Sequence, residues 1–187
     1  MSSALEIPPD LVRRARSGDA SAFRKLVDAL SGLTFNIAWR MTGHRADAED
    51  MSQEVFLRLH RHFATYDPRL AFLPWFRRLT TNACLNWCRT HRSRRPASLG
   101  ETDPAAPAQP PPEEPSEILR EAVQSLPPDQ RLAVTRFYYE NLGVAEIAES
   151  MEVPIGTIKT WLFRARETLK SRLRIMKPNE AGEGIRP

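Results

Sequence analysis

A proline-rich segment at residues 96–115 divides the chain in two and constrains its fold more than any other feature. Seven of its twenty residues are proline, none is basic, and Leu99 is its one large apolar residue. Such a segment can form neither a helix nor a packed core. We therefore predict a flexible linker. Two roles stay open for it: a passive spacer, or an acidic strand threaded through a positively charged channel of a partner.

Apolar residues on both sides of this linker recur at helical spacing, and no strand-like alternation occurs. Asp10 and Asp19 are candidate N-caps, and Gly18 and Gly43 are candidate helix ends. The sequence predicts an all-α chain with two small helical domains, residues 10–95 and 116–176, followed by a disordered tail at 177–187. The expected core of the first domain is Phe23, Leu26, Val27, Leu30, Leu33, Ile37, Met41, Ala48, Met51, Val55, Leu59, Trp75, Phe76, Leu79, Ala83 and Trp87.

Residues 144–172 have the pattern of a helix-turn-helix. Two amphipathic helices flank a break at residues 152–154, and Ile158, Leu162, Ala165 and Leu169 form the apolar stripe of the second helix. Its other side carries hydroxyls and basic groups, which suit the major groove of DNA, although an ordinary helical hairpin with a solvated basic face remains an alternative. The candidate DNA-contacting residues are Thr157, Lys159, Thr160, Phe163, Arg164 and Arg166.

The basic charge is unevenly distributed. The whole chain has a net charge of +4, but residues 1–95 hold 16 basic and 9 acidic side chains. Residues 72–95 combine arginines, asparagines and aromatics, which can bind phosphates, base edges and exposed bases. Core packing is the alternative for the aromatics Trp75, Phe76 and Trp87. The second set of candidate DNA-contacting residues is Arg77, Arg78, Asn82, Asn86 and Arg89.

A mixed acidic and apolar stripe marks the helix predicted from residue 47. Asp50, Gln53, Glu54 and Leu57 lie at i, i+3, i+4 and i+7, opposite the core face. This pattern favours docking on a basic helix of a partner protein.

Several other classes of protein are disfavoured. Cys84, Cys88 and His91 fall at i, i+4 and i+7 and could present three ligands to zinc, but a fourth ligand is not evident, so we expect no metal site. No phosphate-binding glycine loop or catalytic set occurs, so we expect neither a cofactor nor enzymatic activity. Without a signal-peptide pattern or a long apolar run, the protein is expected to be cytoplasmic, with no membrane insertion.

The ordered set of the acidic helix, the residue 72–95 helix, the linker and the helix-turn-helix resembles bacterial RNA polymerase sigma factors. The size and order are similar to the extracytoplasmic-function (ECF) group of the sigma-70 family, over about residues 10–176. The resemblance implies that residues 10–95 are sigma region 2 and residues 116–176 sigma region 4. It also implies core RNA polymerase and promoter DNA as partners, and a role in alternative, stress-response transcription under an anti-sigma factor.

The resemblance assigns each candidate a role. The clamp helices of the largest polymerase subunit would bind the stripe of Asp50, Gln53, Glu54 and Leu57. Region 4 would dock on the flap of the polymerase. The loop from Tyr66 to Leu73 and the helix after it would recognise and melt the minus-ten promoter element. The helix-turn-helix would read the minus-thirty-five element. The alternative function is a dimeric regulator that binds duplex DNA without polymerase. That alternative gives no role to the acidic helix or to the arginines at 77–95.

Overall fold

The computed structural model describes residues 5–91 and 117–176, and within them every regular element is helical. The predicted all-α class is confirmed, whereas the predicted linker and tail lie outside the described residues. The first part contains α1 (Pro9–Arg16), α2 (Ala20–Thr42), α3 (Arg45–His62), a short 3₁₀ turn (Phe63–Thr65) and α4 (Phe72–His91). The second contains α5 (Glu117–Gln124), α6 (Pro128–Tyr138), α7 (Val144–Met151) and α8 (Ile155–Met176).

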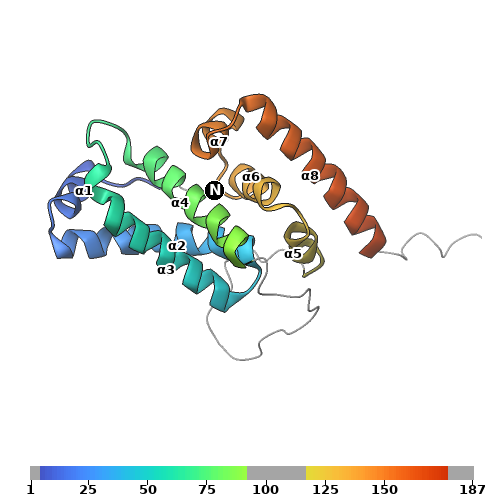
Figure 1. Ribbon diagram of the computed structural model, residues 1–187, viewed down its shortest axis with the longest axis horizontal. Helices are drawn as coiled ribbons and strands as arrows, with labels where there is room; N and C mark the ends of the chain where they lie inside the picture. The colour runs from blue at the N-terminus through green and yellow to red at the C-terminus, as the bar shows by residue number, and fades with distance from the viewer. Residues whose placement is uncertain (1–4, 92–116, 177–187) are drawn as a thin grey trace, which may run out of the picture.

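The helices form two bundles that pack directly against each other (Figure 1). Helices α1–α4 make the first bundle, and α5–α8 make the second. Helix α7 packs on α4, while α5 and α6 pack on α2. Helix α8 runs along the outer edge of the second bundle, away from the first (Figure 1). None of the helices described is long and apolar enough to cross a membrane.

Three of the four predicted helix-end residues act as expected. The Asp19 carboxylate accepts a hydrogen bond from the Ala22 backbone N–H at 2.9 Å and caps α2. Gly18 and Gly43 follow α1 and α2 with φ of 94° and 74°, in the left-handed region that favours glycine. The Asp10 prediction was wrong. Helix α1 already begins at Pro9, whose fixed φ suits a first helical position, so Asp10 lies inside the first turn.

Apolar side chains form two clusters, and one of them joins the bundles. The first cluster lies within α1–α4 and includes Leu26, Leu30, Val55, Leu59 and Phe76. In the second cluster, residues of α2, α3 and α4 pack with residues of α6, α7 and α8. Its fully buried members include Met41, Met51, Cys84, Leu132, Ile147 and Ile158. Burial of this shared surface is the main force that holds the two bundles together.

Two isoleucines of the helix-turn-helix provide a matched test of this core. Ile147 has no exposed surface, whereas Ile155 is 48% exposed. Ile147→Ala should lower the free energy of unfolding by about 2–5 kcal/mol, because it removes buried methylene groups and leaves a cavity. Ile155→Ala should change it by no more than about 0.5 kcal/mol. Urea denaturation followed by circular dichroism measures both, and equal losses would contradict the assigned core.

Candidate nucleic-acid interface

The turn between α7 and α8 fixes the direction of the second helix. Glu152 ends α7 in the left-handed conformation, with φ of 55°. The Val153 N–H then donates to the Ala148 carbonyl at 3.1 Å. The Pro154 carbonyl accepts from the Thr157 N–H at 2.9 Å, in the first turn of α8. These bonds satisfy backbone groups at both helix ends, so the turn is tight and well defined.

Helix α8 has the predicted two faces. Ile158, Leu162 and Ala165 are buried, and Leu169 is half-buried. Lys159, Thr160, Phe163, Arg164 and Arg166 are exposed, and Thr157 is half-buried. Phe163 is 63% exposed, which is unusual for a large aromatic side chain. A helix with an exposed aromatic, hydroxyls and cations has the groups that contact base edges and phosphates.

Contacts with another helix position Arg166. Its Nε donates to the Tyr138 hydroxyl at 2.9 Å, and its guanidinium lies 5.8 Å from the centre of the Phe137 ring. The side chain remains exposed. These contacts hold the guanidinium at the surface of α6, where it can meet a phosphate.

The five candidates on α4 do not share one face. At about 100° per residue, Arg78, Asn82, Asn86 and Arg89 fall within a stripe about 80° wide, whereas Arg77 lies about 100° or more from each of them. Arg78, Asn82 and Arg89 are exposed, and Asn86 is half-buried. The structure therefore brings four of the five together on one surface.

Arg77 and Arg78 both contact glutamates of the second bundle. Arg77 is 20% exposed, and its guanidinium lies 3.6 Å from the Glu140 carboxylate and 3.9 Å from that of Glu146. Arg78 forms an ion pair with Glu152, at the end of α7. These two predicted DNA contacts are thus occupied within the chain.

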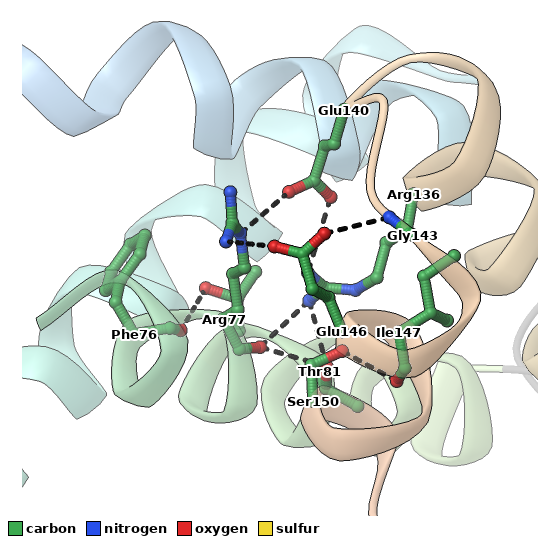
Figure 2. A network of polar contacts seen from close by, with 10 residues as sticks. Phe76, Arg77, Thr81, Arg136, Glu140, Gly143, Glu146, Ile147 and Ser150 are labelled. Atoms are coloured by element: carbon green, nitrogen blue, oxygen red, sulfur yellow. Dashed lines mark hydrogen bonds and ion pairs between the residues drawn. The ribbon is translucent and has the colours of Figure 1, made fainter. Parts of the chain in front are cut away.

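A fully buried arginine lies beside these ion pairs (Figure 2). The Arg136 Nη2 donates to the Arg77 carbonyl at 2.8 Å and to the Thr81 hydroxyl at 2.9 Å, both on α4. Its Nη1 lies 3.4 Å from the Glu140 carboxylate. Burial lowers the pKa of Arg136, and Glu140 opposes that shift. Neither Arg136 nor Glu140 was predicted from the sequence, although an Arg–Glu pair at i, i+4 beside an apolar run was a visible signal.

The acidic stripe on α3 is accessible. Asp50 and Gln53 are exposed, and Leu57 is 51% exposed. Glu54 is half-buried and accepts a hydrogen bond from the Arg58 Nε at 2.6 Å. The opposite side of α3 is core, as predicted. This face therefore combines negative charge with an exposed apolar side chain.

The loop between α3 and α4 is anchored by aromatic contacts. Phe63, Tyr66, Phe72 and Trp75 have ring centres 5.1–6.3 Å apart. The Tyr66 hydroxyl donates to the Leu70 carbonyl at 2.6 Å, and the Leu70 side chain is 64% exposed. Both ends of the loop are thus fixed, while its tip is presented to solvent.

The cysteines have the environment of core residues. Cys84 is buried, and burial raises the pKa of its thiol to about 12. Burial also raises the pKa of Cys88. The His91 ring stacks on Trp87, with ring centres 3.8 Å apart. Among the residues that the structure describes, no three His, Cys, Asp or Glu side chains are grouped as a metal site requires.

Comparisons with known proteins identify both bundles. The model for Sigma-70 region 2 matches residues 26–94, and that for Sigma-70 region 4 matches residues 116–169. The RNA polymerase sigma-H factor of Pseudomonas aeruginosa is 30% identical, with 87% of this chain and 92% of that protein covered. The chain belongs to the RNA polymerase sigma factor family.

Further relatives place this sigma factor in the ECF group. The ECF RNA polymerase sigma factor SigE of Mycolicibacterium smegmatis is 32% identical over 84% of this chain, which spans 65% of the length of that relative. The solved structure of the sigma factor RpoE of Bartonella quintana, in complex with the anti-sigma factor NepR, has a TM-score of 0.64 at 20% identity. The structural match covers 82% of this chain and 97% of the Bartonella quintana chain. This structural likeness shows the fold.

The cysteine environments of the sigma factor predict unequal thiol reactivity. With a pKa of about 12, only roughly one Cys84 thiol in ten thousand is ionised at pH 8. Cys88→Ala, which retains Cys84, should therefore react with a thiol reagent at least about 100-fold more slowly than Cys84→Ala, which retains the half-buried Cys88. In guanidinium chloride the two rates should converge. Fast labelling of Cys84 in the folded protein would contradict its assigned burial.

Proposed function

We propose that this sigma factor binds core RNA polymerase and directs it to promoters that it reads at two separate elements. The observation that carries the proposal is the presence, in one chain, of an exposed polar and cationic face on α8 and an exposed acidic face on α3. A regulator that binds DNA alone has no need of the second surface. The matches to sigma regions 2 and 4, in that order along the chain, support the same role.

Helix α8 reads the minus-thirty-five element in the major groove. Lys159, Thr160, Phe163 and Arg164 supply contacts to the bases and the adjacent backbone, and Thr157 lies at the edge of this surface. Arg166, held by Tyr138, binds a phosphate. The buried Ile158 and Leu162 fix the helix on its bundle, so this face is presented without rearrangement.

Helix α4 and the loop before it bind the minus-ten element. Arg77, Arg78 and Arg89 bind phosphates, and Asn82 and Asn86 bond base edges. The contacts of Phe63 and Tyr66 with Phe72 and Trp75 hold the loop against α4. A base flipped out of the non-template strand is received beside this loop, where unstacking costs a few kcal/mol.

The α3 face docks on the clamp helices of the largest polymerase subunit. Asp50 and Glu54 pair with basic side chains there, while Gln53 and Leu57 contribute polar and apolar contacts. Region 4 binds the flap of the polymerase. The sigma factor thus supplies specificity, and the polymerase supplies the chemistry in the cytoplasm.

An anti-sigma factor is the proposed regulator. The RpoE relative of known structure is bound to the anti-sigma factor NepR. A partner of this kind would keep the sigma factor from polymerase until a stress signal releases it.

Run-off transcription with sigma-free core polymerase and a library of promoter fragments tests the function. The wild-type protein should support specific initiation. Arg164→Ala should reduce it by weakening recognition of the upstream element by about 1–3 kcal/mol, as for a lost base contact, while polymerase binding stays intact. Asp50→Ala with Glu54→Ala should weaken polymerase binding and leave duplex binding by region 4 unchanged.

Two exposed residues on other helices provide matched controls. Arg13→Ala on α1 removes the same charge as Arg164→Ala, and Asp28→Ala on α2 removes one of the two negative charges lost in the α3 double variant; both should preserve transcription. If the Arg164 variant and the α3 double variant lost the same activity to the same degree, the proposed division of labour would be refuted. Tight binding of the wild-type protein to duplex DNA, with no start site, would favour a DNA-binding regulator instead.

A further inference from the structure

Tyr138 lies outside the helix-turn-helix, yet its side chain is part of the surface beside α8. It is the last residue of α6 and is 49% exposed. Its hydroxyl accepts a hydrogen bond from the Arg166 Nε at 2.9 Å, across 28 positions of the chain. The packing of α6 against α8 brings the two side chains together. An exposed aromatic ring with a polar end is well suited to contact a ligand.

The hydrogen-bonding groups of this pair are only partly used within the protein. A tyrosine hydroxyl can donate as well as accept, and that of Tyr138 already accepts from Arg166. Among the residues that the structure describes, none accepts the proton of this hydroxyl, and none accepts a hydrogen bond from the Nη groups of Arg166. The pair therefore offers one O–H and several N–H donors to an acceptor from outside the protein.

The Phe137 ring holds both members of the pair in place. Its centre lies 5.0 Å from the centre of the Tyr138 ring, with the ring planes at 79°. The same centre lies 5.8 Å from the guanidinium carbon of Arg166, within the range of a cation–π contact. A side chain that is already held loses less conformational freedom when it binds a ligand. The donors are thus positioned before any ligand arrives.

The pair also lies on one side of the proposed DNA-reading face. At about 100° per residue, Arg166 projects within about 40° of Lys159 and Lys170, whereas Arg164 projects about 160° away. Lys159, Arg166 and Lys170 are all exposed, and we call them the cationic flank of α8. When a helix lies in the major groove, side chains on its flank meet the phosphates that border the groove. Tyr138 is therefore next to a place where a phosphate is expected.

We propose that Tyr138 and Arg166 form one phosphate-binding site between α6 and α8. The Tyr138 hydroxyl donates to one oxygen of a DNA phosphate, and an Nη of Arg166 donates to another. The Arg166 Nε stays on the Tyr138 hydroxyl, so each residue positions the other. The inference rests on the DNA-reading role proposed for α8. It adds a DNA contact from α6, outside the recognition helix.

The full-length Tyr138→Phe variant tests this site, with a short duplex of random sequence as the probe. Its affinity, measured by fluorescence anisotropy, should fall about fivefold, because a hydrogen bond to a charged group and the anchor of the guanidinium are both lost. The dependence of affinity on salt should stay unchanged, because the variant removes no cation. Arg166→Ala should instead make the slope of log affinity against log salt shallower by about 1.

Double variants show whether the two side chains share one phosphate. In an Arg166→Ala background, Tyr138→Phe should lower the affinity by less than about twofold, because the shared site is already lost. Lys170→Ala removes another cation of the flank, and Lys170 pairs with Glu167 at 2.9 Å rather than with Tyr138. In that background Tyr138→Phe should keep its effect of about fivefold, because the two sites are independent.

Tyr139→Phe is the matched control. It removes the same hydroxyl from the neighbouring tyrosine, which is half-buried and whose ring lies 3.7 Å from the Arg40 guanidinium. This variant should bind the duplex as the wild type does. Because Tyr138 is exposed, Tyr138→Phe should also fold as the wild type does, and thermal unfolding checks this.

The outcomes separate a shared phosphate site from other roles. A loss of affinity in Tyr138→Phe that disappears in the Arg166→Ala background supports the site. Equal losses in both backgrounds overturn it, as do unchanged or tighter binding by Tyr138→Phe and a wild type that binds no duplex at low salt. Wild-type duplex affinity combined with weaker binding to core polymerase also overturns it, and would assign Tyr138 to a protein contact.

The duplex measurements need neither polymerase nor a start site. Failure of the proposed function would therefore appear separately, as an absence of initiation by the wild-type protein in run-off transcription.

Discussion

The buried guanidinium of Arg136 is the interaction on which the relation between the two regions depends. A charge can be withdrawn from water only where partners compensate it, and its partners come from both regions: the Arg77 carbonyl, the Thr81 hydroxyl and the Glu140 carboxylate. The apolar cluster around Met41 and Leu132 supplies most of the attraction. Apolar contact alone is not directional, so Arg136 and its partners set the position in which the bundles meet.

The same contact explains why the two proposed DNA-binding surfaces are not equally exposed. Helix α8 runs along the outer edge of its bundle (Figure 1), and its Phe163 and Arg164 side chains are exposed. On α4, Asn82 and Arg89 are exposed, but Arg77 and Arg78 face glutamates of region 4. The acidic face of α3, which is proposed to dock on polymerase, also remains exposed. In this structure, the contacts proposed for the minus-ten element are therefore the most restricted.

Local structure was largely predictable from the sequence because helical periodicity and end residues report directly on the backbone. The stripe Ile158, Leu162 and Ala165 is buried as expected, and Asp19 caps α2. The prediction that Asp10 caps α1 failed because the helix already begins at Pro9. Predicted roles for individual site residues, such as Asn82 at DNA, stay predictions.

The contact between the regions was beyond sequence reasoning for a physical reason. Periodicity shows that Ile37 and Met41 are buried, but it does not show what buries them. The sequence likewise shows that Arg77 is a cation that can bind a phosphate. It does not show that the carboxylate of Glu140, 63 residues away along the chain, lies beside this guanidinium instead. Opposite charges that are distant in sequence carry no local signal of their pairing.

Footprinting of the complex formed with core polymerase on a selected promoter would show whether regions 2 and 4 bind separate promoter elements. Two elements about 25 base pairs apart should be protected, as for separated regions 2 and 4, with permanganate-reactive unpaired thymines at the downstream element only. These signals should require both the sigma factor and polymerase. A single pair of symmetric half-sites, protected without polymerase and with no melted bases, would contradict it.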